Sequence, residues 1–263
     1  MTVWRLEELF PDQVEARLRE LPALVLPFGT IEWHSHHLPL GLDGIVAAEL
    51  CTLVAERTGA LLAPVSYWAV GGVPYPYTLN LPGAQVEPLL ATLFEQFGAM
   101  GLRVLVAFTG HFGLDQTLAL KRAALAVMAR SPVTILPLTE YDLVTDTYLG
   151  DHAAVGETSL LQAFRPDLVR LDAVPPGEPL DGIIGPDPRG PDPLSPDPRG
   201  PGPGDTASAA HGQALATAIA GRTSEFLLRL VYDTSAVQRA HYIEALRAGT
   251  RVVERLVHLR AEQ

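Results

Sequence analysis

A short segment that begins at residue 32 gathers residue types that bind metal ions. It reads EWHSHHLPLGLD and places Glu32, His34 and Asp43 among two further histidines, directly after an apolar run. Glu32 and His34 are two residues apart, so on extended backbone their side chains lie on one side. Carboxylates and neutral imidazoles suit zinc, manganese or iron. The pattern predicts a divalent metal site, in which Asp43 could bridge two ions.

Two other segments carry groups that could complete such a site. His111 lies in Thr-Gly-His-Phe-Gly at the end of an apolar run, where the glycines allow the backbone to turn sharply. His152 precedes Glu157 by five residues in a loop that contains two glycines. Glu157 also opens a helical run, where the helix dipole alone would favour an acid. Asp151 could be a partner of these residues or a helix cap.

The elements that must position these residues alternate between apolar runs and helix-spaced segments. The pattern predicts strands at 23–28, 60–65, 103–108 and 133–138, and helices at 44–58, 86–100 and 115–130. Such alternation is typical of an α/β fold with a mainly parallel central sheet and helices on both faces. Ligand sites in these sheets lie beyond the carboxyl ends of the strands. Both the segment at 32–43 and His111 fall there.

The last third of the chain begins with a segment of different composition. Residues 174–204 are rich in proline and glycine, and GPDPRG is nearly repeated as SPDPRG, so we expect an extended loop insertion. Two helices are expected after it, at 206–231 and 235–260. Because 263 residues are an ordinary length for one α/β domain, we expect a single domain over 1–263.

Composition narrows the classes of function. The net charge of −11 argues against a nucleic-acid partner, which would require a basic surface. No apolar run approaches the roughly 18 residues that cross a bilayer, and the first residues lack the pattern of a secretion signal. The single cysteine, Cys51, is typical of a reducing compartment. We therefore expect a cytoplasmic protein with no nucleic-acid partner and no membrane contact.

An aromatic segment lies between the second predicted strand and the next helix. Residues 67–80 place tryptophan and tyrosines among glycines and prolines. At the carboxyl edge of the sheet, such a segment could form a wall of a substrate pocket. A rigid loop at a subunit interface is an equally good interpretation.

In combination, these motifs resemble the creatininase (creatinine amidohydrolase) family. The resemblance rests on four motifs in order: Glu32-Trp-His34, His37-Leu-Pro-Leu-Gly-Leu-Asp43, Gly110-His111, and His152 followed by Glu157-Thr-Ser. It implies one α/β domain, assembled in many members as a homo-hexamer, with two divalent ions of zinc, manganese or iron. It also implies a small-molecule substrate and hydrolysis of non-peptide C–N bonds in cyclic amides and formamides. One branch of the family trims a peptide instead.

The resemblance implies a ligand set for the two ions. Glu32 and His111 would bind one ion, His34 would bind the other, and Asp43 would bridge them. Glu157 falls where the family has an acid that binds or flanks the second ion. The expected catalyst is a hydroxide that bridges the two ions.

The resemblance also suggests which residues move protons. His152 matches a family histidine placed for proton transfer or substrate contact, and would protonate the departing nitrogen. Glu157 is the second catalytic candidate, and His37 is expected to support the site from behind. A lactone or an intermediate of peptide maturation are alternative substrates for the same chemistry.

The chain departs from the family pattern after the third predicted strand. The departures are Thr109, Phe112, Gly113 and Leu114. Gly113 stands where creatininase has a metal-binding glutamate, which argues against creatinine as the substrate. Asp115 could replace that ligand, although a helix N-cap is its more usual role. His36 replaces a common proline and adds a possible ligand. These changes leave open a catalytically inactive, metal-binding assembly subunit.

Overall fold

The computed structural model describes residues 2–146, 148, 150–173 and 207–261. Within them, one five-stranded sheet has the strand order β1-β3-β2-β4-β5, and every pair of neighbouring strands is parallel. The strands are β1 (Trp4–Arg5), β2 (Ala23–Phe28), β3 (Leu61–Leu62), β4 (Val104–Thr109) and β5 (Thr134–Thr139). The predicted parallel α/β sheet is therefore confirmed. The predicted loop insertion at 174–204 lies outside the described residues.

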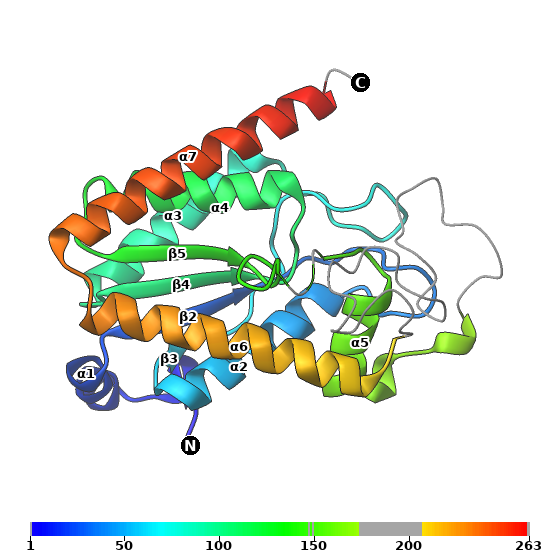
Figure 1. The fold of residues 1–263 in the computed structure, drawn as a ribbon, viewed down its shortest axis with the longest axis horizontal. Coiled ribbons are helices and arrows are strands. Elements are labelled where there is room, and N and C mark those ends of the chain that lie inside the picture. The colour runs from blue at the N-terminus through cyan, green and yellow to red at the C-terminus, as the bar shows by residue number, and fades with distance from the viewer. Residues whose placement is uncertain (1, 147, 149, 174–206, 262–263) are drawn as a thin grey trace.

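Helices cover both faces of the sheet, as predicted. They are α1 (Pro11–Glu20), α2 (Leu42–Thr58), α3 (Gly83–Ala99), α4 (Leu114–Met128), α5 (Val155–Phe164), α6 (Ala209–Tyr232) and α7 (Ala236–Ala261). Figure 1 shows α3, α4 and α7 on one face and α2, α5 and α6 on the other. No helix in the described part of the chain is long and apolar enough to cross a membrane.

The central strands are apolar along their whole length because both faces are covered. Every residue of β2, β4 and β5 is buried. The strand predicted at 60–65 is shorter than expected, since only two of its residues form β3. Pro64 lacks an amide hydrogen for the ladder, and pairing resumes only as an isolated bridge between Phe28 and Ser66. β2 and β4 pair over their whole length, so they end side by side.

Candidate metal centre

The amino end of α2 is inserted between the ends of β2 and β4. Gly29 follows β2 and Gly110 follows β4, and both lie against the backbone of the first turn of α2. A Cβ at Gly110 would lie 2.2 Å from the carbonyl oxygen of Asp43, and one at Gly29 would lie 2.1 Å from the amide nitrogen of Gly44. Only glycine permits this approach, which carries the Asp43 carboxylate to the centre of the sheet edge.

The segment after β2 holds Glu32 and His34 by backbone contacts. Nδ1 of His34 lies 3.1 Å from the carbonyl oxygen of Glu32, so a proton on Nδ1 leaves Nε2 as the lone-pair nitrogen. The amide of Val73, in the aromatic segment, donates to Oε1 of Glu32 at 2.5 Å. Oε2 of Glu32 is then left to face the cluster. The two side chains are thus oriented before any ligand binds.

His111 follows β4 and completes one side of the cluster. Its Nδ1 lies 2.9 Å from Oε2 of Glu32 and 3.4 Å from Oδ2 of Asp43. Thr109 shapes the turn, because its hydroxyl accepts from the amide of His111 and donates to the carbonyl of the same residue. Thr109 therefore has a structural reason to be present at this departure from the family pattern.

Glu157 enters the cluster from the first turn of α5. The carboxylate of Asp151 accepts hydrogen bonds from the amides of Gly156 and Glu157, at 2.7 and 3.1 Å, and so satisfies two amino-terminal amides of the helix. The amide of Ala153 donates to Oε2 of Glu157 at 2.6 Å. The same oxygen lies 3.7 Å from Nε2 of His34. The structure therefore makes Asp151 a partner of the helix start.

These side chains form two groups that share Asp43. One group is Glu32, Asp43 and His111, and the other is His34, Asp43 and Glu157; in each, the ligand atoms lie within 4.8 Å of one another. Oδ1 of Asp43 lies 2.9 Å from His34, whereas Oδ2 faces His111. The two carboxylate oxygens thus point to different groups, the arrangement that a bridging ligand requires.

The hydrogen bonding of the cluster fits cations better than an internal network. Four buried atoms have no partner in hydrogen-bond geometry, although imidazole and carboxylate atoms lie as close as 2.9 Å: Oε2 of Glu32, Nε2 of His34 and both carboxylate oxygens of Asp43. Such buried atoms are rare in folded proteins. Here they converge on common points, as the ligand atoms of a divalent ion do. The donor set of carboxylates and imidazoles suits zinc or manganese.

The electrostatics of the cluster show strong coupling between its carboxylates and imidazoles. Burial opposes ionisation of Asp43, but His34 and His111 outweigh it and lower the pKa of Asp43. Burial likewise opposes the charged form of His111, yet Asp43 and Glu32 raise its pKa well above the ordinary value. For Glu157, burial and then the charges of Asp151 and Asp43 raise the pKa well above its usual range. Glu157 therefore needs a cation to remain ionised in this position.

His152 lies beside His34, and with Glu32 and His34 it forms a further group of residues that could hold a metal ion. Its ring centroid is 4.6 Å from that of His34, and its Nε2 lies 3.2 Å from the carbonyl oxygen of Trp33. Burial, and then the charge on His34, lower the pKa of His152 to about 4. The resemblance suggested that His152 donates a proton to the departing nitrogen. The structure instead makes His152 a neutral imidazole at pH 7, which must accept a proton before it can donate one.

The other histidines of the segment lie outside the two ligand groups. His36 is exposed, with its ring at the edge of Trp33, and it contributes to none of the clusters found among the described residues. Nε2 of His37 lies 3.0 Å from the hydroxyl of Thr158, the residue after Glu157. His37 therefore links this segment to the start of α5.

The departures at the start of α4 also have structural explanations. A Cβ at Gly113 would lie 2.6 Å from Nε2 of His111, so a glutamate cannot occupy this place unless the imidazole moves. Asp115 is in the first turn of α4, and Gly113 is the N-cap. The expected N-cap role of Asp115 is therefore wrong. Asp115 is also absent from the ligand groups found among the described residues.

One buried acid near the centre was missed in the sequence. Glu140 directly follows β5, is 2% exposed, and has an Oε2 without a hydrogen-bond partner. Its pKa is raised well above the ordinary value by burial, and the charge of Asp43 adds to this effect. The signal that could have revealed it was its place at the carboxyl end of a predicted strand.

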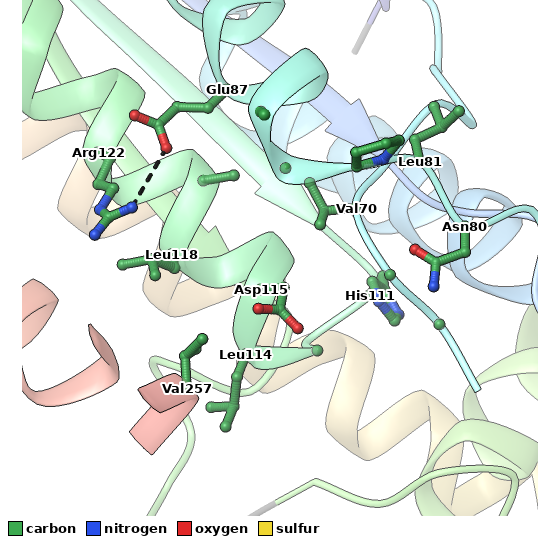
Figure 2. Close-up of a pocket in the computed structure, with 17 residues that line it drawn as sticks. Val70, Asn80, Leu81, Glu87, His111, Leu114, Asp115, Leu118, Arg122 and Val257 are labelled. Carbon is green, nitrogen blue, oxygen red and sulfur yellow. Dashed lines mark ion pairs between the residues drawn. The ribbon is translucent and has the colours of Figure 1, made fainter. Parts of the chain in front are cut away.

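A cavity of about 540 Å³ opens beside the centre. His111 lies at one end of it, and the amino ends of α3 and α4 form its walls (Figure 2). Residues of the aromatic segment, among them Val70, Gly72 and Asn80, contribute a third wall. This segment therefore shapes a pocket next to the cluster, one of the two roles expected for it.

The fold and the cluster together define a class of protein: a parallel α/β protein with a carboxylate–imidazole centre suited to divalent ions at its sheet edge. More particularly, the chain belongs to the creatininase family, because the family model described as creatinine amidohydrolase matches residues 7–227. The resemblance noted in the sequence is thereby confirmed. The chain is accordingly a member of a hydrolase family.

Two relatives illustrate the range of the family. The chain is 32% identical over 177 residues to a creatinine amidohydrolase from Pseudomonas putida. This match covers 57% of this chain and 67% of the relative. The chain is also 31% identical over 160 residues to a mycofactocin precursor peptide peptidase from Mycolicibacterium smegmatis. That match covers 58% of this chain and 62% of the relative. The aligned part thus spans about two thirds of each relative.

Solved structures agree with the fold. A structure described as the manganese form of creatininase has a TM-score of 0.70 at 24% identity, covering 88% of this chain and all 100% of that one. A mutant creatininase of Zn-Zn type has a TM-score of 0.70 at 25% identity, with the same coverage of 88% and 100%. The similar structures thus include manganese and zinc forms.

Proposed function

We propose that this protein is a metal-dependent amidohydrolase that cleaves a non-peptide C–N bond in a cyclic amide or formamide. Glu32, Asp43 and His111 would hold one divalent ion, and His34, Asp43 and Glu157 the other. The observation that carries the proposal is the orientation of Asp43, whose two carboxylate oxygens face different ligand groups. A carboxylate that served only as a hydrogen-bond acceptor would not require two such groups of buried atoms without hydrogen-bond geometry.

Divalent ions at such a site lower the pKa of bound water to about 7 and polarise a carbonyl oxygen. The chain supplies the rest of the chemistry. Glu32, His34 and Asp43 are buried and pre-oriented, so little reorganisation is needed when a substrate binds. His152 is neutral at pH 7, beside His34, and can accept a proton and then pass it to the departing nitrogen.

The substrate is expected to differ from creatinine. Gly113 and Thr109 form a turn that keeps His111 in place and has no room for an added ligand at position 113. The relatives support hydrolysis as the reaction but differ in their named substrates, which are creatinine in one case and a precursor peptide in another. A lactone or a peptide intermediate therefore remains the alternative substrate.

The test compares variants at three positions of one segment. We expect His34→Ala and Asp43→Ala to lose bound metal, measured by elemental analysis, together with turnover of cyclic amides, formamides, lactones and short peptides. His36→Ala is the matched control, because His36 is exposed and lies outside the ligand groups. Full turnover by either site variant after chelation would contradict the two-ion proposal. Bound metal in the wild type without turnover of any substrate would favour the assembly-subunit alternative.

A further inference from the structure

The cavity beside the candidate metal centre is much larger than the cluster itself needs. It runs from His111 along one stripe of α4 to Arg122, and Val257 of α7 forms part of its wall (Figure 2). The stripe has helical spacing, since Asp115, Leu118 and Arg122 recur every three or four residues. From Asp115 to Arg122 the helix rises by about 10 Å. The cavity is therefore elongated and starts at the ligands.

The end of the cavity at the metal centre is open because of its glycines. Gly113 lies against Nε2 of His111, and Gly72 lies near the carboxylate of Glu32, where an added Cβ would come within 3.4 Å of Cδ. Both glycines line the cavity. Side chains at these two positions would close the space beside the ligands, so a molecule held at the centre can extend into the cavity.

About half of the exposed lining of the cavity is apolar. The apolar side chains include Val70, Leu81, Leu114, Leu118 and Val257. Such side chains bind hydrocarbon by removing it from water. A cavity of this volume lies in the range that binds drug-sized ligands, and is far larger than a small unsubstituted ring requires.

The far end of the cavity offers no cation to an anionic ligand. Arg122 is paired with Glu254 at 2.9 Å and with Glu87 at 3.8 Å, so two carboxylates face one guanidinium. Among the described residues that line the cavity, Arg122 is the sole lysine or arginine, whereas Glu87 and Asp115 both carry carboxylates. An anionic group placed there would meet more negative than positive charge.

We propose that this cavity, here called the arm pocket, binds an uncharged and partly apolar substituent of the substrate. The enzyme would then act on an amide that carries a chain of several carbons, and not on a compact unsubstituted ring. This inference rests on the proposed function, because the amide must be held at the ligands where the arm pocket begins.

Hydroxamates test the arm pocket without requiring turnover, since their head group binds divalent ions whichever bond the enzyme cleaves. Straight-chain hydroxamates from acetohydroxamate to octanohydroxamate would be titrated calorimetrically into the zinc-loaded protein. We expect the affinity to rise by up to about fourfold for each added methylene until the pocket is filled. Octanohydroxamate with a terminal carboxylate should bind about tenfold more weakly than octanohydroxamate, because that charge is buried without a partner.

A substitution in the pocket wall provides the second measurement. Gly83 lines the pocket at the start of α3, and a Cβ there makes only ordinary contact with Val70, at 3.7 Å. Gly83→Leu should lower the affinity ratio of octanohydroxamate to acetohydroxamate by about fourfold or more, the value of one methylene. The matched control is Gly221→Leu on α6, where a Cβ meets no atom within 4 Å; its ratio should equal that of the wild type.

The outcomes separate the two proposals. Affinity that rises with chain length and falls in Gly83→Leu supports the arm pocket. Binding that is independent of chain length, or a carboxylate-terminated chain that binds best, overturns the arm pocket and leaves the metal centre intact. Failure of every hydroxamate to bind overturns the metal centre, and this inference with it.

Discussion

Glu140 is a buried carboxyl group to which the proposed reaction assigns no role. It lies at the end of β5, next to the strand that carries His111, and its Oε2 has no hydrogen-bond partner. Burial raises its pKa well above the value of 4.5 that an exposed glutamate has, and the charge of Asp43 adds to the effect. The protonated form is thus favoured in the folded state, although the unfolded chain releases the proton near pH 4.5.

Glu140→Gln should therefore change how stability depends on pH. In the wild type, the stabilisation that protonated Glu140 gives the folded state is fully present below pH 4.5. It is lost as the pH rises toward the folded-state pKa. Glutamine does not titrate. The free energy of unfolding of the variant should therefore rise, relative to that of the wild type, by up to about 1.4 kcal/mol per pH unit above 4.5. Urea unfolding of the metal-free proteins between pH 4 and 8 measures the difference.

An exposed glutamate serves as the control for this effect. Glu244 on α7 is exposed and pairs with Arg247, so Glu244→Gln removes a carboxylate without removing a buried one. Its stability difference from the wild type should not grow over the same pH range. A difference for Glu140→Gln that stays constant from pH 4 to pH 8 would show that this carboxyl group has no raised pKa.

Single residues of the site were recognisable in the sequence to different degrees. Glu32, His34 and Asp43 were recognisable because they lie in one short segment, and the structure brings them together with His111. The amide of Val73, which orients Glu32, could not be recognised in the sequence because it comes from a loop 41 residues away. Its contribution is a backbone hydrogen bond, which leaves no residue-type signal. The contacts that orient a ligand are thus harder to predict than the ligand.

At the scale of elements, the start of α5 shows how one helix end positions a ligand. Asp151 accepts from the amides of Gly156 and Glu157 and from the hydroxyl of Tyr148, the last at 2.7 Å. The Ala153 amide meanwhile holds the Glu157 carboxylate toward His34. The helix end and the ligand therefore depend on the same carboxylate, that of Asp151.

Asp151→Ala should accordingly affect both stability and metal binding. Loss of a capping carboxylate costs about 1–2 kcal/mol of unfolding free energy, measured by urea titration of the metal-free protein. Loss of a group that orients a metal ligand weakens metal affinity by about 10–100-fold, measured by zinc titration. The control is Asp167→Ala just beyond α5, which breaks an exposed pair with Arg165 and should leave stability and zinc affinity close to those of the wild type. Unaltered zinc affinity in Asp151→Ala would separate Asp151 from the positioning of Glu157.

The elements themselves differed in how well they could be predicted. The central strands and the helices between them were predictable, because each is a buried apolar run or has one apolar stripe. α1 was not predicted, since PDQVEARLRE has few apolar residues and buries none of them. β1 and β3 are two residues each and lie at one side of the sheet. Their pairing depends on neighbouring strands more than on their own sequence.

At the scale of the whole molecule, the candidate ligands come from four separate places in the chain. They lie after β2, at the start of α2, after β4 and at the start of α5, and they meet only because the sheet is parallel. The unfolded chain cannot present the same groups. Metal ions should therefore bind the folded state in strong preference to the unfolded one, and metal binding should be linked to stability.

This linkage gives a prediction with a defined size. At a free zinc concentration 100 times the dissociation constant, zinc should stabilise the folded state against unfolding by about 2.7 kcal/mol. For a chain of this length, that corresponds to a rise of about 5–10 °C in Tm, measured by differential scanning calorimetry with and without a chelator. Asp43→Ala should show almost no rise, because Asp43 belongs to both ligand groups. His36→Ala should keep the whole rise, since His36 belongs to neither.

The pH dependence of the same rise tests the ligand types. Imidazole and carboxylate ligands must lose their protons to bind a cation, so protons compete with zinc and the rise in Tm should shrink as the pH falls from 7 to 5. Zinc bound only by exposed carboxylates on the surface would also stabilise the protein, but its effect would survive in Asp43→Ala. A rise of equal size in the wild type and Asp43→Ala would place the bound zinc elsewhere on the molecule. If the rise is lost in Asp43→Ala but kept in the wild type and in His36→Ala, the bound zinc lies at the two ligand groups that Asp43 joins.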